Sequence, residues 1–144
     1  MATIRLTKEF TFEAAHMLEG YDGLCREIHG HSYKLFVTVK GEPESDSSSP
    51  KLGMVMDFGD LKRIVNEQIV GRLDHSFMMR NTLAAEDILN QLSYRFAKIV
   101  LTDYPPTCEN MLSDFVRGTA RKHRAMLVAS ARDGIVICRV ARLG

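Results

Sequence analysis

The sequence contains no tryptophan, and its 144 residues include only three cysteines and four prolines. Cys25, Cys108 and Cys138 are an odd number at irregular spacing, which argues against a disulfide framework and favours a reducing, cytoplasmic compartment. The sequence also has no apolar run long enough to act as a signal peptide or to cross a bilayer. We therefore expect a cytoplasmic protein without membrane association.

The net charge of the chain is also small. The 19 basic residues are balanced by 18 acidic ones, which leaves a formal charge of +1. Such a chain has no global field that would attract nucleic acid, so an anionic ligand must be held by local groups. The hydrophobic content of 45% and the charged content of 26% are ordinary for a globular protein, and residues 1–144 suit one domain with its own core.

Two segments near the N-terminus alternate between apolar and polar residues, at positions 3–14 and 31–40. A period of two predicts strands that each bury one face. Two further β-type runs surround Asp133 and Gly134, a pair of residues that favours a tight hairpin turn.

Helical patterns occupy the middle of the chain. Asp57 is predicted to cap the N-terminus of a helix, and apolar residues then recur every three or four positions as far as Leu73. A weaker pattern covers residues 85–96, and another helix is predicted to begin after the two prolines at 105–106. Strand pairs at both ends with helices between them predict an α+β fold, an antiparallel sheet covered on one face by helices.

The segment "CREIHGHSY" contains the first candidate site. His29 and His31 are two positions apart at the start of a predicted strand, so both imidazoles leave the same face. Gly30 between them adds no bulk. Two imidazoles on one face can chelate a divalent ion, most commonly Zn²⁺, although histidines that only form hydrogen bonds in a turn are the alternative.

His16 is the candidate third ligand. It ends the first strand pattern in "FEAAH", and it would meet His29 and His31 if the first two predicted strands pair as a hairpin. Three imidazoles leave one zinc position open, which is the catalytic arrangement. The alternative is a half-buried, hydrogen-bonded histidine at a strand end.

Three further residues carry proton-transfer chemistry. Cys25 is a candidate thiolate base beside the metal, a candidate fourth ligand, or an inert buried thiol. Asp74 and His75 offer an acid–base pair, because a carboxylate can fix the tautomer of an imidazole and raise its basicity. Adjacent side chains often point apart, however, so the sequence leaves this pairing open.

Five blocks, "FEAAH", "CREIHGHSY", "GMVMDFGDLK", "LDHSF" and "PPTCEN", resemble in order and spacing the 6-pyruvoyltetrahydropterin synthase family. This family includes the bacterial 6-carboxytetrahydropterin synthases of the queuosine pathway, and the spacing between Cys25 and "HGH" is that of the bacterial branch. The resemblance runs from about Phe10 to Asn110.

The resemblance implies a zinc-dependent lyase that converts 7,8-dihydroneopterin triphosphate to 6-carboxy-5,6,7,8-tetrahydropterin, with loss of triphosphate and a two-carbon aldehyde. It also assigns roles to eight residues: zinc ligands His16, His29 and His31; the proton-abstracting thiolate Cys25; the acid–base pair Asp74 and His75; and the pterin-side residues Thr107 and Glu109.

The fold that the resemblance implies is the T-fold, a four-stranded antiparallel sheet with two main helices on one face. Its subunits join edge to edge into barrels, as trimers or hexamers, with pterin sites at the interfaces. One position departs from the family pattern, because the ring-anchoring glutamate aligns with Ser130, and serine cannot replace a bidentate carboxylate.

This departure leaves alternatives open. Another acidic residue such as Glu109 anchors the ring, or the enzyme has pyruvoyl-type activity or takes a different heterocycle. A more distant alternative is a non-catalytic zinc module in which Cys25 closes the metal site.

Overall fold

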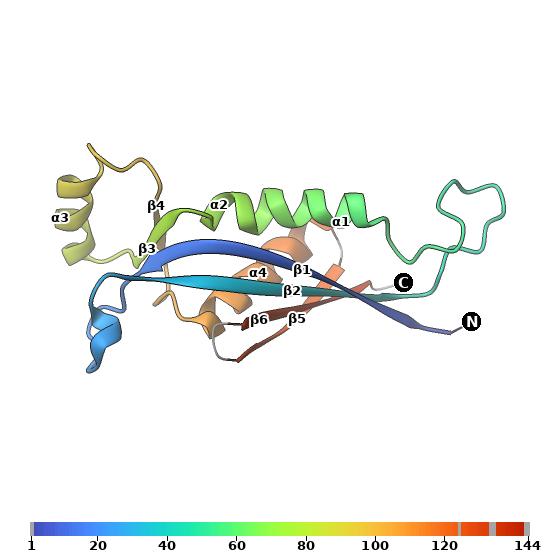
Figure 1. The fold of residues 1–144 in the computed structure, drawn as a ribbon, viewed down its shortest axis with the longest axis horizontal. Helices are drawn as coiled ribbons and strands as arrows, with labels where there is room; N and C mark the ends of the chain where they lie inside the picture. Colours follow the sequence, from blue (N-terminus) through green and yellow to red (C-terminus); the bar gives the residue numbers. More distant parts are fainter. Residues whose placement is uncertain (1, 124, 133–134, 143–144) are drawn as a thin grey trace.

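The computed structural model describes residues 2–123, 125–132 and 135–142, with side chains as far as Gly118. Its central feature is a long antiparallel hairpin of β1 (Ile4–His16) and β2 (His29–Gly41) (Figure 1). The register runs from Ile4 opposite Gly41 to His16 opposite His29. The predicted pairing of the first two strands is confirmed, and both strands extend as far as the candidate ligands.

The sheet has six strands in the order β4-β3-β1-β2-β6-β5. The strands β5 (Ala125–Arg132) and β6 (Ile135–Arg142) pair antiparallel, as the predicted C-terminal hairpin requires, whereas β6 lies parallel to β2. The turn at residues 133–134 and the side chain of Ser130 lie outside the described residues.

Two short strands, β3 (Ser76–Arg80) and β4 (Ile99–Thr102), extend the sheet beyond β1, and both pairings are parallel. The prediction of a four-stranded antiparallel sheet is therefore correct only in part: the fold is α+β, but the sheet is mixed and wider. For the β3–β4 pair the physical reason is the helix α3 (Leu83–Leu92) between the two strands, since a crossover through a helix returns the chain in a parallel direction. Strands this short show too little alternation to be recognised in the sequence.

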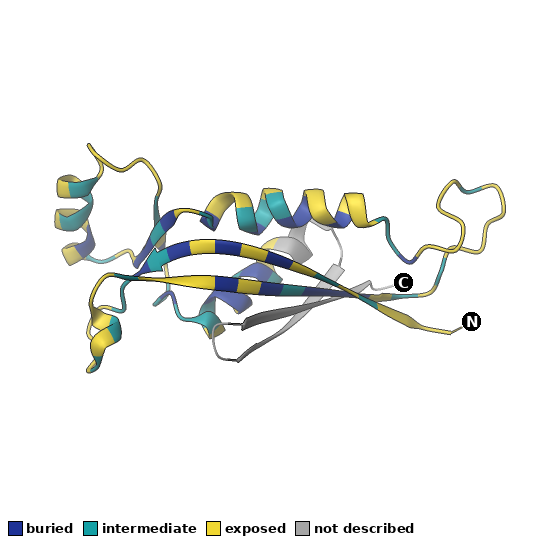
Figure 2. Ribbon diagram, viewed as in Figure 1, coloured by how far each residue is buried: buried dark blue, intermediate teal, exposed yellow. Residues whose placement is uncertain are grey.

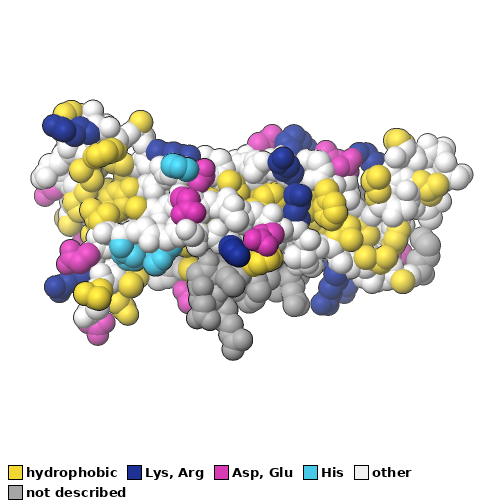
Figure 3. All heavy atoms as spheres, in the orientation of Figure 1, with side chains coloured by type: hydrophobic (Ala, Val, Ile, Leu, Met, Phe, Trp, Pro, Cys, Tyr) yellow, Lys and Arg dark blue, Asp and Glu magenta, His cyan; other side chains and the backbone are white. Residues whose placement is uncertain are grey.

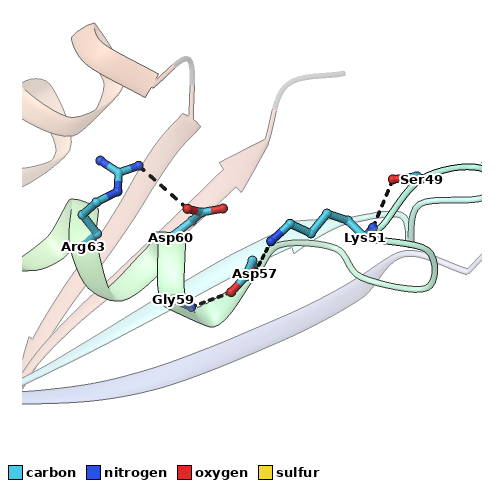
Figure 4. A network of polar contacts seen from close by, with 6 residues as sticks. All are labelled: Ser49, Lys51, Asp57, Gly59, Asp60 and Arg63. Carbon is cyan, nitrogen blue, oxygen red and sulfur yellow. Dashed lines mark hydrogen bonds and ion pairs between the residues drawn. The ribbon is translucent and has the colours of Figure 1, made fainter.

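The main helix runs from Phe58 to Leu73, where the sequence predicted its end. It consists of α1 (Phe58–Val65), a π-helical turn η2 (Asn66–Val70) and α2 (Gly71–Leu73). The predicted cap is also confirmed, because the Asp57 carboxylate accepts a hydrogen bond from the Gly59 N–H at 2.7 Å (Figure 4).

The core lies between one face of the hairpin and two helices. Alternate residues of β1 and β2 are buried, as Figure 2 shows. They pack against the apolar stripe of the main helix and against that of α4 (Cys108–His123). The hairpin contributes Phe10, Phe12, Tyr33, Leu35, Val37 and Val39, and the helices contribute Leu61, Val65, Ile69, Met111, Leu112 and Phe115. Both main helices therefore cover the same face, as predicted.

None of the helices in the described part of the chain combines the length and hydropathy of a membrane span.

Candidate active site

The hairpin register brings three imidazoles together. His16 lies opposite His29, and His31 lies opposite Ala14 on the same face. The His16 Nε2 atom is 2.9 Å from the Nε2 atom of His29 and 3.1 Å from that of His31. One ring nitrogen from each histidine lies within 4.8 Å of the other two, so the three residues could hold a metal ion.

Backbone carbonyls fix the orientation of two of these rings. The Nδ1 atom of His16 is 2.8 Å from the carbonyl oxygen of Pro106, and the Nδ1 atom of His29 is 2.7 Å from that of Glu27. A carbonyl oxygen only accepts, so both rings carry their proton on Nδ1 and, when neutral, present a lone pair at Nε2. Two lone pairs that face each other at 2.9 Å repel unless a cation lies between them, so this donor set fits a divalent ion.

Burial favours the neutral form of two of these histidines, His16 and His31. It lowers the pKa of His16 more strongly than the hydrogen bond to Pro106 raises it, and the neighbouring histidines lower that pKa further. Burial also lowers the pKa of His31. Because only a neutral imidazole can bind a metal, both shifts favour the ligating state. His16 is buried, His29 half-buried and His31 exposed, so the cluster opens to solvent on one side.

The contact with Pro106 was not predicted. The resemblance assigned Thr107 and Glu109 to the substrate, and the structure shows that the carbonyl of Pro106, just before Thr107, orients the candidate ligand His16. The Thr107 hydroxyl accepts from the Asn110 N–H at 3.3 Å and so caps helix α4, while Glu109 is exposed in its first turn. No local signal could have revealed the Pro106 contact, because the two residues are 90 positions apart.

Cys25 lies in the short 3₁₀-helix η1 (Leu24–Arg26), within the loop that joins the two histidine-bearing strands. It is a half-buried free thiol, and its carbonyl oxygen accepts from the Leu18 N–H at 2.9 Å. Its sulfur is not one of the clustered donor atoms. This placement favours an open three-histidine site over one that Cys25 closes.

Asp74 and His75 lie where α2 ends, and they do face each other. The Nδ1 atom of His75 is 3.0 Å from the Asp74 carboxylate, whose other oxygen accepts from the Glu13 N–H at 2.9 Å. The Glu13 N–H and then His75 lower the pKa of Asp74, so this carboxyl group is ionised. Among the described residues, neither member of the pair forms a hydrogen bond with Cys25 or with the histidine cluster.

The backbone explains why these adjacent side chains meet. His75 has φ 58°, a left-handed conformation that costs a non-glycine residue about 1–3 kcal/mol. Its N–H donates to the Glu13 carbonyl oxygen at 2.6 Å, which ties the turn to β1. Strain of this kind is typical of functional sites. Figure 3 shows histidine side chains at two separate places on one face of the molecule.

Two buried hydroxyl groups, those of Tyr33 and Ser76, have no hydrogen-bond partner among the described residues. The Tyr33 ring stacks on Phe12 with centroids 4.8 Å apart and packs edge-on against His31 at 5.7 Å. Burial raises the pKa of Tyr33, so this residue stays neutral beside the cluster. A separate hollow of about 330 Å³ lies between α2, β4 and α4, and none of the predicted site residues lines it.

Comparison with known proteins identifies a family of similar sequences. The family model described as 6-pyruvoyl tetrahydropterin synthase matches residues 5–137. A 6-carboxy-5,6,7,8-tetrahydropterin synthase from Haemophilus influenzae is 45% identical over 78 residues, which cover 54% of each chain, so the match spans about half the length of that relative. Proteins of the same name from Synechocystis and Rickettsia typhi are 37% and 31% identical, over 64% and 75% of this chain and 71% and 74% of theirs.

Solved structures share the fold. An uncharacterised protein from Wolinella succinogenes superposes with a TM-score of 0.64 at 19% identity, covering 85% of this chain and 86% of its own. The 6-pyruvoyl tetrahydropterin synthase of Caenorhabditis elegans gives a TM-score of 0.56 at 23% identity, covering 84% and 79%. With nearly the whole sequence matched, the chain belongs to the 6-pyruvoyl tetrahydropterin synthase family, whose named members here are enzymes that make pterins.

Proposed function

We propose that this protein is a zinc-dependent lyase that converts 7,8-dihydroneopterin triphosphate to 6-carboxy-5,6,7,8-tetrahydropterin, a step of queuosine biosynthesis. The observation that carries the proposal is the clustering of three imidazoles, two of them oriented by backbone carbonyls, on the hairpin whose loop holds Cys25. The names of the relatives at 31–45% identity support this reaction over others of the family.

His16, His29 and His31 would hold the zinc ion. When bound, zinc would supply Lewis acidity to the side-chain oxygens of the substrate, so that neighbouring protons are lost near neutral pH. Zinc rather than another divalent ion is the choice because all three donors are nitrogens.

The chain's own groups would move the protons. The Cys25 thiolate takes a proton from the substrate side chain, and a nearby cation would stabilise that thiolate. The His75 imidazole, oriented by Asp74, returns and accepts protons at its Nε2 atom. The ionised state of Asp74 suits this role, because a carboxylate holds the imidazole in one tautomer.

Glu109 is the proposed anchor of the pterin ring. It is exposed at the start of α4, three residues after the carbonyl that orients His16. A carboxylate there can accept from the ring N–H and amino groups, the interaction that Ser130 cannot make. Thr107 would line the same end of the helix while its hydroxyl caps the first turn.

We further propose that the protein is a homo-oligomer, a trimer or a hexamer built as a barrel. The face of the hairpin opposite the core carries exposed polar residues such as Glu13, Ser32 and Lys34, and is not covered by the helices. In the arrangement that the family resemblance implies, the pterin sites would lie at the interfaces between subunits. Native mass spectrometry tests this directly, and a monomer at micromolar concentration would contradict it.

Incubation of the zinc-loaded protein with 7,8-dihydroneopterin triphosphate, followed by mass spectrometry of the products, tests the function. The proposal predicts the carboxy product together with triphosphate and a two-carbon aldehyde. Cys25→Ala should abolish turnover while zinc is retained, and Cys108→Ala, which removes a second free thiol of the described residues, is the matched control. Absence of turnover by the zinc-loaded wild type would count against the proposal.

The alternative candidate is pyruvoyl-type activity, which the name of the matched family model and of the Caenorhabditis elegans structure favours. The same assay separates the two, since the pyruvoyl reaction keeps the side-chain carbons on the ring and releases no aldehyde. Release of triphosphate without aldehyde would assign this alternative. A screen of related bicyclic rings tests whether Ser130 marks a different substrate.

A further inference from the structure

Only Asp74 and His75 separate helix α2 from strand β3. Asp74 has φ −61° and ψ 128°, and His75 has φ 58°. These angles resemble the two central residues of a type II β-turn, for which about (−60°, +120°) and a φ of about +80° are typical. Glycine or asparagine ordinarily takes the second position, because a Cβ atom is strained at positive φ.

A type II turn differs from a type I turn mainly by rotation of its central peptide, which here joins Asp74 to His75. In a type I turn the second central residue has a negative φ, which a histidine adopts without strain. The local sequence therefore favours type I, and contacts from outside the turn must hold the peptide in the type II orientation.

Lys98 provides such a contact. Its Nζ atom donates to the carbonyl oxygen of Asp74, which belongs to the rotated peptide, and to the carbonyl oxygen of Gly71 at 2.9 Å. Its own carbonyl oxygen accepts from the Phe77 N–H at 3.0 Å, which fixes the Lys98 backbone against β3. A cation at the end of α2 also complements the helix dipole.

The rotated peptide is thus held at both of its polar atoms. The His75 N–H donates to the Glu13 carbonyl oxygen, a backbone contact that survives any side-chain substitution. The Asp74 carbonyl oxygen is held by the Lys98 side chain. Within the described part of the chain, Lys98 is therefore the side chain whose removal would release this peptide.

We propose that Lys98 is a positioning residue for the acid–base pair. Its ammonium group holds the Asp74–His75 peptide in the type II orientation, and so holds the His75 imidazole beside the Asp74 carboxylate. The consequence for catalysis rests on the proposed function, but the effect on the turn does not.

Amide hydrogen exchange, which needs no substrate, tests whether Lys98 holds the Asp74–His75 peptide. In Lys98→Met, the His75 amide should exchange roughly five- to tenfold faster than in the wild type, because a charge-assisted hydrogen bond is lost. The Phe77 amide should not change, since its acceptor is the backbone of residue 98. Lys34→Met is the matched control, because Lys34 is an exposed lysine that pairs with Glu9 on the other face of the sheet.

Steady-state kinetics test whether the Lys98 contact matters for catalysis. In Lys98→Met, kcat should fall while KM and zinc content stay near wild-type values, and Lys98→Arg should restore much of the loss. If the wild type does not act on 7,8-dihydroneopterin triphosphate, the proposed function fails, whereas the exchange data still decide the role of Lys98. Unchanged His75 exchange in Lys98→Met, or an equal change in Lys34→Met, would overturn the inference.

A glycine at the strained position gives a second test. In a His75→Gly background the turn takes positive φ without strain, so Lys98→Met should alter exchange at residue 75 by less than about twofold. An effect as large as in the wild-type background would mean that Lys98 acts through general stability, and would also overturn the inference.

Discussion

The histidine cluster stands on two paired strands of 13 residues each, whereas the Asp74–His75 pair stands on a two-residue turn. In the cluster, the strand register brings His16 opposite His29, and backbone carbonyls of Pro106 and Glu27 orient these two rings. In the pair, a left-handed histidine is held by contacts from Glu13 and Lys98. The sheet register thus places the candidate ligands and a carbonyl contact orients His16, while the pair needs tertiary contacts to hold a backbone conformation that its own residues disfavour.

The largest expected difference between the two regions is in zinc affinity. His29→Ala removes one of three ligands and should weaken zinc affinity by at least about 100-fold, beyond the effect of losing an outer-shell partner. His75→Ala, the matched control, should bind zinc as the wild type does. Competition with a chromophoric chelator measures both affinities, and equal losses in the two variants would contradict the separation of the two sites.

The core beneath the cluster should dominate stability. Phe12, which is 2% exposed and stacks on Tyr33, supports the strand segment that carries the ligands. Phe12→Ala should lower the free energy of unfolding by about 3–5 kcal/mol, because it leaves a cavity. Urea denaturation measures this cost.

Thr11→Ala is the control for that variant, since Thr11 is exposed on the opposite face of the same strand. Its effect should stay within about 0.5 kcal/mol. A similar loss in both variants would show that this part of the hairpin does not form the core.

The smallest effect should be a gain. His75→Gly should raise the free energy of unfolding by about 0.5–1 kcal/mol, because glycine adopts positive φ without the strain that histidine carries. His75→Ala keeps a Cβ atom and should show no such gain. Thermal denaturation of the two variants separates relief of strain from loss of the imidazole, and a stability loss in the glycine variant would refute strain at this turn.

The contrast also explains what the sequence could predict. Period-two alternation extends to His16 and begins again at His29, so the convergence of the ligands followed from pairing two strands. The main helix and its Asp57 cap could also be predicted from the sequence, because apolar spacing and cap residues are local signals.

What the sequence could not predict depends on distant contacts. The parallel strands β3 and β4 are too short to show a pattern. β4 lies beside β3 because α3 returns the chain, and β3 in turn pairs with the distant strand β1. The orientation of His16 by Pro106 and of the Asp74–His75 peptide by Lys98 each join residues at least 24 positions apart. Whether Asp74 faces His75 was open for the same reason, since φ at residue 75 is set by those contacts.

On the proposed function, three imidazoles hold one zinc ion and leave a position open for substrate. X-ray absorption at the zinc edge of the resting protein tests it most directly. The first shell of the zinc ion should contain nitrogen and oxygen only, from three imidazoles and solvent. A sulfur scatterer at about 2.3 Å would mean that a cysteine closes the site, and would contradict the account.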